Sequence, residues 1–172
     1  MFETERCFIN TVQKMDYDDV RSLYTNLEVR KFLGGIRDEK SIKAAMDDIF
    51  SPNENSFYWV VKEKRTDQFL GLVSLTPHHD GVYQEISYQL LPSWWGKGYA
   101  TEVVQHIINY SLSELNLSEL VAETQTANMS SCKLLESVGM TLERTVNRFG
   151  AEQAIYSIKS KSRRSIQRRN PL

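Results

Sequence analysis

Apolar side chains along the 172-residue chain recur with two different periods, and these periods predict where helices and strands form. In residues 98–114 an apolar residue follows every third or fourth position, which places these side chains on one side of an α-helix. The residues of this apolar stripe are Tyr99, Val103, Val104, Ile107, Ile108 and Leu112. Similar spacing predicts helices over residues 38–50 and from about 128 to 138, where Gly139 ends the second one.

The N-terminal region is also expected to be helical. Asp16 has a side chain suited to capping a helix, and we expect that helix to run to about Asn26. Residues 28–33 are expected to continue helically until Gly34 and Gly35 stop them.

Seven shorter segments have the alternation or composition of β-strands: residues 6–12, 56–63, 68–76, 83–91, 119–124, 141–148 and 152–158. The short turns between the second, third and fourth segments predict antiparallel neighbours. Strand 83–91, helix 98–114 and strand 119–124 form a βαβ unit, whose two strands should be parallel. The expected fold is α/β (α+β), a single domain over residues 1–158 with a mixed sheet and helices on both faces.

Composition narrows the class of protein. Hydrophobic residues make up 41% of the chain and charged residues 25%, which is typical of globular domains. No apolar run approaches the roughly 18–20 residues that span a bilayer, and the first residues, "MFETERCF", lack the apolar region of a secretory signal. Cys7 and Cys132 fit a reduced intracellular protein better than a disulfide scaffold. The expected location is cytoplasmic.

The net charge of −1 conceals an asymmetry along the chain. Residues 159–172 carry six basic residues and no acidic one, which leaves 15 basic against 22 acidic residues, a net −7, in the rest. We expect this tail to be a disordered, solvated terminus. A module that binds nucleic acid or the ribosome through the tail is the alternative, but nucleic acid is not the expected partner.

A glycine-spaced turn, "WWGKGYAT", lies between strand 83–91 and helix 98–114. A P-loop is excluded because its upstream glycine is missing and Lys97 precedes Gly98. A dinucleotide-binding fingerprint fits poorly because Thr101 occupies its last place and only one βαβ unit exists. Two alternatives stay open on the residues alone: a cradle for the pyrophosphate of coenzyme A, and a tight turn that binds nothing.

Two adjacent histidines, His78 and His79, lie in a predicted hairpin turn. Adjacent residues of a strand point to opposite faces, and no spacing of His, Cys or Asp completes a metal site around them. The sequence therefore predicts turn histidines and no metal.

Two separated segments resemble the GNAT superfamily of N-acetyltransferases. "EISYQLLPSWWGKGYATEV" resembles the family's acetyl-CoA-binding motif, and "TANMSSCKLLESVGM" (126–140) resembles its second motif. Trp95, in place of a polar first residue of the glycine motif, is similar to the branch that acetylates the N-terminal alanine of ribosomal proteins. The resemblance also includes "EVRKFLGG" (28–35), which looks like the family's substrate-side segment.

The resemblance implies acetyl-CoA as cosubstrate and assigns residues to it. Strand 83–91 would separate from strand 119–124, and backbone groups of Tyr88, Leu90 and Leu91 would pair with the pantetheine arm. Asn128 matches the family's cofactor-contacting asparagine. The residues expected to hold the diphosphate are Trp95, Gly96, Lys97, Gly98, Tyr99, Ala100 and Thr101.

Acetyl transfer to an amine needs a base and a proton source for the leaving thiolate. Glu85 begins the cleft-lining strand and matches a glutamate common in this branch, so we expect it to be the base. The alternative bases are Glu28, Glu123 and Glu143.

At the position of the residue that would protonate the thiolate, this sequence differs from the broad family. Many relatives carry a tyrosine where this chain has Leu135. Ser131 matches a serine proposed for that role in the ribosomal-protein branch, and a small helix-packing residue is the alternative interpretation. Phe32, Leu33 and Tyr58 are expected to line the acceptor site or to fill the core.

The predicted function is transfer of an acetyl group from acetyl-CoA to a primary amine. A protein N-terminal α-amine, such as that of a ribosomal protein, is the leading acceptor, and a small-molecule amine is the alternative. A non-catalytic acyl-CoA-binding regulatory protein of the same fold is a further alternative. No membrane partner is expected, and the sequence fits a monomer or a homodimer.

Overall fold

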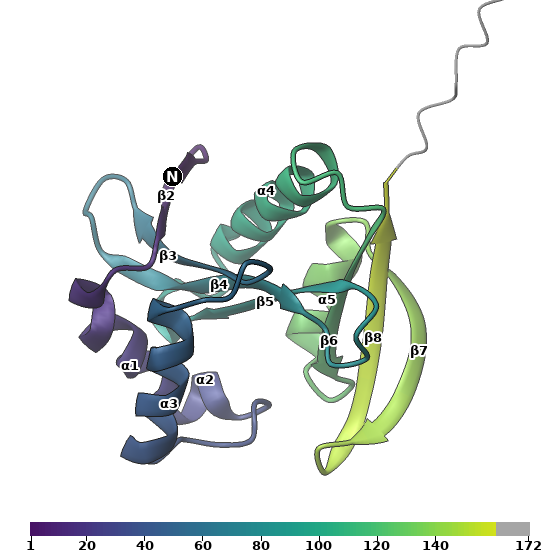
Figure 1. Ribbon diagram of the computed structural model, residues 1–172, viewed down its shortest axis with the longest axis horizontal. Coiled ribbons are helices and arrows are strands. Elements are labelled where there is room, and N and C mark those ends of the chain that lie inside the picture. Colours follow the sequence, from purple (N-terminus) through teal and green to yellow (C-terminus); the bar gives the residue numbers. More distant parts are fainter. Residues whose placement is uncertain (161–172) are drawn as a thin grey trace, which may run out of the picture.

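The computed structural model describes residues 1–160, and residues 161–172 lie outside the described part. Its strands form one mixed sheet in the order β1-β2-β3-β4-β5-β6-β8-β7 (Figure 1). The strands are β1 (Phe2–Glu3), β2 (Cys7–Thr11), β3 (Phe57–Glu63), β4 (Phe69–Pro77), β5 (Gln84–Leu90), β6 (Glu119–Gln125), β7 (Thr141–Arg148) and β8 (Ala151–Lys159). The helices are α1 (Tyr17–Thr25), α2 (Leu27–Arg30), α3 (Glu39–Phe50), α4 (Tyr99–Ser113) and α5 (Met129–Ser137), with short 3₁₀ turns at Lys14–Asp16 and Pro92–Trp94.

The pairing of the strands confirms the predicted topology. Strands β1 to β5 pair antiparallel in sequence order, β5 pairs with β6 in parallel, and β6, β8 and β7 are again antiparallel. The parallel pair is connected through α4, as a βαβ unit requires. Strand β1 is an addition that the sequence pattern did not predict.

Helices cover both faces of the sheet and produce two apolar clusters. On one face, α4 and α5 pack on the sheet through a cluster that includes Val103, Ile107 and Leu135. On the other face, α1 and α3 pack through a cluster that includes Leu23 and Met46. Figure 1 shows α1, α2 and α3 grouped beside the β2–β5 part of the sheet, while the β7–β8 hairpin lies at the far end.

The N-terminal helical region differs from the prediction in two places. Asp16 precedes α1, but its side chain accepts from the backbone N–H of Gln13 (2.8 Å) instead of capping the helix. Asn26 interrupts the helix: its backbone is extended, and its side chain accepts from the N–H groups of Glu28 and Val29, which starts α2. Helix α2 then ends at Arg30 instead of continuing to Leu33, and the chain continues as a turn in which the N–H groups of Leu33 and Gly35 both donate to the Arg30 carbonyl (3.0 Å each).

The C-terminal boundary also shifts slightly. Strand β8 includes Lys159, one residue beyond the predicted domain end, and the Ser160 N–H donates to the Ser118 carbonyl (2.9 Å). The remainder of the predicted basic tail, residues 161–172, lies outside the described residues. Among the helices of residues 1–160, none is long and apolar enough to cross a membrane.

Candidate functional site

Strands β5 and β6 are paired over only two positions. Gln84 is opposite Leu120 and Glu85 is opposite Val121, and no further partners follow. Strand β5 nevertheless continues to Leu90, paired along its other edge with β4 over its whole length. The two parallel strands therefore separate beyond Glu85, as the resemblance predicted.

The separation leaves backbone groups of β5 without a strand partner on the β6 side. The N–H of Leu91 donates to Leu70 across β4 (2.8 Å), and the direction of N–H groups alternates along a strand. The N–H groups of Tyr88 and Leu90 therefore point toward the separated side. Leu91 differs from these two, because its carbonyl also accepts from the Trp94 N–H (3.0 Å) and both of its backbone groups are engaged.

The glycine turn exposes a row of hydrogen-bond donors at the start of α4. Gly96 and Gly98 have φ of 69° and 80°, in the left-handed region that favours glycine. Within residues 1–160, the six consecutive N–H groups from Gly96 to Thr101 donate to no other protein atom. The N-terminus of α4 also carries the positive end of the helix dipole. This arrangement can bind an anion such as a diphosphate.

An arginine that the sequence analysis missed, Arg6, forms hydrogen bonds to this turn and to the first turn of α4. Arg6 lies between β1 and β2, and its Nη1 donates to the Lys97 carbonyl (2.9 Å). Its Nε and backbone N–H both donate to Glu102 in the first turn of α4 (2.7 and 2.8 Å). The guanidinium also lies 4.2 Å from the ring centroid of Tyr99. Arg6 is 91 residues from Lys97 in sequence, so no local pattern indicated the contact.

The remaining residues of the turn have protein partners of their own. The indole N–H of Trp95 donates to the Leu90 carbonyl (2.8 Å), and the indole N–H of Trp94 donates to Phe69 (3.1 Å). The Lys97 ammonium donates to the Ser93 carbonyl (2.7 Å). The expected contact of Lys97 with a phosphate stays a prediction, and that contact would have to compete with this bond.

Glu85 lies where the two strands separate. With Ser87 and Gln89, it is on the face of β5 opposite to Ile86 and Tyr88, which pack toward α4 and α5. Burial raises the pKa of the Glu85 carboxyl above its usual range, and the nearby charge of Glu123 adds to this rise. A raised pKa makes the carboxylate a stronger base for a proton on an amine.

Glu123 is held as a carboxylate by a cluster of polar residues beside Glu85. Arg148 donates to both of its oxygens, and His78 Nε2 lies 3.0 Å from Oε2. Burial raises the pKa of Glu123, but the hydrogen bonds from Arg148 and His78 outweigh it and lower the pKa overall. Glu85 and Glu123 therefore have pKa values shifted in opposite directions, and the role of Glu85 as the base stays a prediction.

His78 and His79 lie in the turn after β4 as predicted, but the expectation that they point to opposite faces was wrong. His78 is only 3% exposed, and its ring lies 4.2 Å from that of His79, with both rings directed at Glu123. Strand β4 ends at Pro77, so neither histidine belongs to a strand and strand alternation does not apply. The ligand atoms of His78, His79 and Glu123 lie within 4.8 Å of one another. A metal ion there would have to displace the guanidinium of Arg148 from Glu123.

The alternative bases are placed differently. Glu28 is exposed on α2, and the Glu143 carboxylate accepts from Ser157 (2.6 Å) on the β7–β8 hairpin. Glu123 is already paired with Arg148, so Glu85 is the carboxylate with a raised pKa at the strand separation.

Ser131 and Asn128 meet at the start of α5. The Asn128 side chain caps the helix by accepting from the Ser131 N–H (3.3 Å). The Ser131 hydroxyl lies 2.8 Å from the hydroxyl of Tyr88 on β5, a contact that the sequence analysis did not anticipate. Leu135, at the place where many relatives carry a tyrosine, is 1% exposed in the core.

The expected acceptor residues do not form one group. Tyr58 lies on the same face as Ser87, two strands away, or about 10 Å. It packs in the α1–α3 cluster, which does not include Phe32 or Leu33. These two residues follow α2 in a turn that is fixed by Arg30.

Arg30 connects that turn to the site. This arginine, 4% exposed, donates to the Gly35 carbonyl (2.9 Å), to the Leu33 carbonyl and to the Gln89 side chain (3.4 Å). It thereby holds the predicted substrate-side segment against β5. Burial lowers the pKa of its guanidinium.

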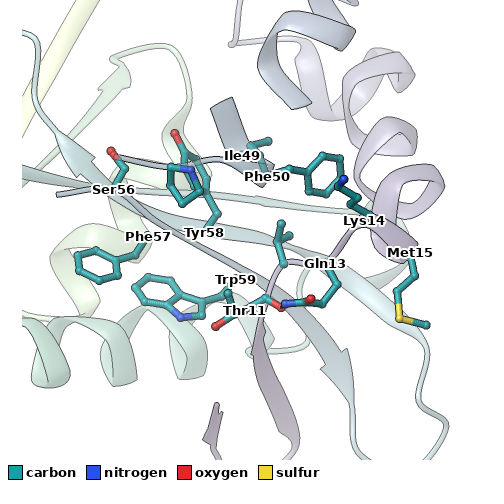
Figure 2. Close-up of a pocket in the computed structure, with 12 residues that line it drawn as sticks. Thr11, Gln13, Lys14, Met15, Ile49, Phe50, Ser56, Phe57, Tyr58 and Trp59 are labelled. Atoms are coloured by element: carbon teal, nitrogen blue, oxygen red, sulfur yellow. The ribbon is translucent and has the colours of Figure 1, made fainter. Parts of the chain in front are cut away.

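A cavity of about 640 Å³ lies away from the glycine turn, where β2 ends beside β3 and the end of α3. Figure 2 shows Tyr58 on one side of β3 near Ile49 and Phe50, and Phe57 and Trp59 stacked on the other. Its lining includes Tyr58 but neither Glu85 nor Ser131. The site at the β5–β6 separation is thus distinct from this cavity.

Comparisons with known proteins agree with this geometry. Residues 6–141 match the model of the acetyltransferase (GNAT) domain family. A Bacillus licheniformis protein with the name "Uncharacterized N-acetyltransferase p20" is 31% identical over 81% of this chain and 82% of its own length. Two solved structures share the fold. One is a GNAT-family acetyltransferase from Bacillus anthracis, with a TM-score of 0.80 and 20% identity over 92% of this chain and 97% of that one. Another is a Vibrio cholerae spermidine N-acetyltransferase in complex with CoA and spermine, with a TM-score of 0.76 and 17% identity over 90% of this chain and 95% of that one. Since the family model spans most of the chain, the chain belongs to the GNAT family and is an N-acetyltransferase.

Proposed function

We propose that the protein transfers the acetyl group of acetyl-CoA to a protein N-terminal α-amine, with the coenzyme held between β5 and β6. The observation that carries this proposal is the early end of the β5–β6 pairing at Glu85 and Val121. It leaves the N–H of Tyr88 available to an amide of a pantetheine arm and the N–H of Leu90 available to the oxygen of the acetyl group.

The glycine turn suits the diphosphate of the same ligand. Among residues 1–160, six N–H groups at the start of α4 have no protein acceptor, and apart from the neighbouring residues no atom lies within 4 Å of a Cβ built on Gly96. A phosphate can therefore approach this backbone closely. Arg6 holds the Lys97 carbonyl and keeps the turn in place.

Acetyl-CoA supplies the activated thioester. Glu85 takes the proton of the attacking amine, which forms a C–N bond as the C–S bond breaks and its electron pair moves to sulfur. The N–H of Leu90 stabilises the oxyanion. Ser131, in the first turn of α5, faces the departing thiolate.

The surroundings of Glu85 favour an amine that continues into a peptide. Leu33 (43% exposed) lies in the turn that Arg30 ties to Gln89 on β5. Phe149 (74% exposed) contacts His79 edge-on, next to Glu123 on β6. Both exposed apolar residues belong to segments linked to β5 or β6, where they can contact the residues that follow an N-terminal amine. The Trp95 variant of the glycine motif, seen in the ribosomal-protein branch, also supports this acceptor class.

A small cationic amine is the second candidate. The described part of the site holds the carboxylates Glu85, Glu123 and Asp80 against the guanidinium groups of Arg144 and Arg148. Within residues 1–160 Glu85 forms no ion pair, and its carboxylate accepts only from the Ser87 hydroxyl (3.4 Å), so it is available to a cationic acceptor. The spermidine acetyltransferase above shows the same fold at 17% identity, which motivates spermidine as a probe.

The test combines binding with turnover. Calorimetry measures binding of CoA, and thiol release from acetyl-CoA is followed with peptides bearing a free N-terminal alanine or serine, the same peptides blocked by N-acetylation, and spermidine. We expect CoA binding and release that depends on the free N-terminus. Release with spermidine alone would assign the second candidate. Binding without release from any acceptor would leave a non-catalytic acyl-CoA-binding protein, and absence of binding would refute the proposal.

A further inference from the structure

We propose that Tyr88 is a positioning residue that orients the Ser131 hydroxyl as a hydrogen-bond donor to the sulfur of coenzyme A. This inference rests on the proposed function, because it concerns the leaving group of the same reaction. The observation behind it is the 2.8 Å contact between the two hydroxyl oxygens.

The contact crosses the separation between the two parallel strands. Tyr88 is three residues beyond Glu85, the last residue of β5 that is paired with β6. Ser131 belongs to α5, the helix that follows β6. The two hydroxyl groups therefore approach the separated region from opposite sides, on the α4–α5 face of β5.

A count of hydroxyl protons shows that the pair has a donor to spare. Tyrosine and serine hydroxyl groups carry one proton each, and the contact between them uses one of the two. Within residues 1–160, neither hydroxyl has another hydrogen-bond partner. One proton of the pair is therefore free to bond to a ligand between β5 and α5.

The phenol is the better donor inside the pair, so the free proton is the one on Ser131. Burial raises the pKa of Tyr88 to about 12, so the phenol stays protonated across the physiological range. When Tyr88 donates to Ser131 Oγ, the serine proton turns away from Tyr88, and bonds in such a chain strengthen one another. Ser131 lies in the first turn of α5, where the positive end of the helix dipole also favours a thiolate.

The pair donates a hydrogen bond and does not transfer its proton. A thiol has a pKa near ~8.5, well below that of the phenol, so a thiolate does not remove the proton from this pair. As the amine nitrogen bonds to the acetyl carbon, the C–S bond breaks and its electrons move to sulfur. The amine proton goes to Glu85, and the sulfur leaves as a thiolate bonded to Ser131, taking a proton from solvent on release.

The first readout does not depend on turnover. The pKa of the thiol of bound CoA is measured from ultraviolet thiolate absorbance in Tyr88→Phe, Ser131→Ala and the double variant. Each single change should raise that pKa by about 1, equivalent to a tenfold loss in thiolate stabilisation. The double variant should match Ser131→Ala, because Tyr88 acts through Ser131. The matched controls are Tyr110→Phe, at another partly buried tyrosine that belongs to α4, and Ser130→Ala, at an exposed neighbour of Ser131 on α5. Neither control should change the thiol pKa.

The second readout is a split between kcat and KM. Tyr88→Phe should lower kcat about tenfold with the KM for acetyl-CoA unchanged, because the bond forms as charge develops on sulfur. The midpoint of thermal unfolding measures whether loss of the Tyr88–Ser131 contact between β5 and α5 destabilises the fold. If unfolding shifts while the thiol pKa and kcat match those of the wild type, the contact is only structural and the inference is overturned. If the wild type itself binds no CoA, the proposed function fails instead, so the two failures are distinguishable.

Discussion

Replacing Gly96 by alanine should have two separate effects: backbone strain lowers the free energy of unfolding, and the added methyl group weakens the binding of CoA. Gly96 has φ of 69°, and an L-residue in this region costs about 1–2 kcal/mol. In the described part of the chain, no atom outside the adjacent residues lies within 4 Å of the added Cβ, so the backbone strain is the whole expected loss of unfolding free energy. Gly150, in the β7–β8 turn, has φ of 76° and the same open surroundings, which makes Gly150→Ala the matched control.

The two variants should differ in CoA affinity. At Gly96 the added methyl group occupies the space through which a phosphate approaches the free N–H groups. Loss of one charge-assisted hydrogen bond costs about 1.5–3 kcal/mol, or about 10- to 150-fold in Kd. Gly150→Ala should bind CoA like the wild type, with an equal drop in stability.

The assay pairs denaturant unfolding with calorimetric titration of CoA into each folded variant. Equal stability losses with weaker binding only in Gly96→Ala are the expected result. Unchanged affinity in that variant would refute the role of the turn, and equal loss of affinity in both would show that general strain, rather than a local contact, weakens binding.

Three further predictions concern charged residues around the site. The pKa of Glu85 is raised, so the acidic limb of the pH–rate profile should lie at a higher pH than the pKa of an ordinary glutamate, which is ~4.3. Glu85→Gln should remove that limb from the profile. Arg6→Ala should weaken CoA binding about fivefold in calorimetry by releasing the Lys97 carbonyl, whereas the exposed Arg65→Ala should not. Folding lowers the pKa of Glu123, so the pairing of Glu123 with Arg148 stabilises the folded protein at any pH above the pKa that Glu123 has in the unfolded chain. This stabilisation is lost as the pH falls through the lower pKa that Glu123 has in the folded protein. Arg148→Ala should therefore cost about 3 kcal/mol at neutral pH in denaturant unfolding and remove that acid dependence, and a loss under 1 kcal/mol would contradict it.

Elements with strong local signals were predicted well. Helix α4 has a continuous apolar stripe, and strands β3, β4 and β5 are bounded by short turns, so hydrophobic period and turn chemistry agree at each of them. The helix predicted from Asp16 to about Asn26 is confirmed as α1, but the Asp16 side chain does not cap it, and the expected helical continuation to Leu33 ends at Arg30. The choice between side-chain acceptors within a few residues depends on backbone angles that composition does not specify.

The candidate site was predicted only where its residues are close in sequence. The glycine turn and the α5 cap each fit within a short motif, so Gly96, Gly98 and Asn128 could be named. The partners of those motifs come from distant segments: Arg6 meets Lys97 across 91 residues, and Tyr88 meets Ser131 across 43. No local pattern records such pairings.

The sequence by itself determined most of the elements, the antiparallel pairing of β3, β4 and β5, the parallel pairing of β5 and β6, and the position of the turn that precedes α4, because side-chain period and glycine placement act within one or two turns of chain. Only the tertiary structure decided that β5 and β6 separate after Glu85, that His78 and Arg148 both bond to Glu123, and that Tyr88 reaches Ser131. These features depend on sheet register and on how the β7–β8 hairpin and α5 pack beside β6. Packing brings together residues that are far apart in the chain, and it sets the burial that shifts the pKa of Glu85.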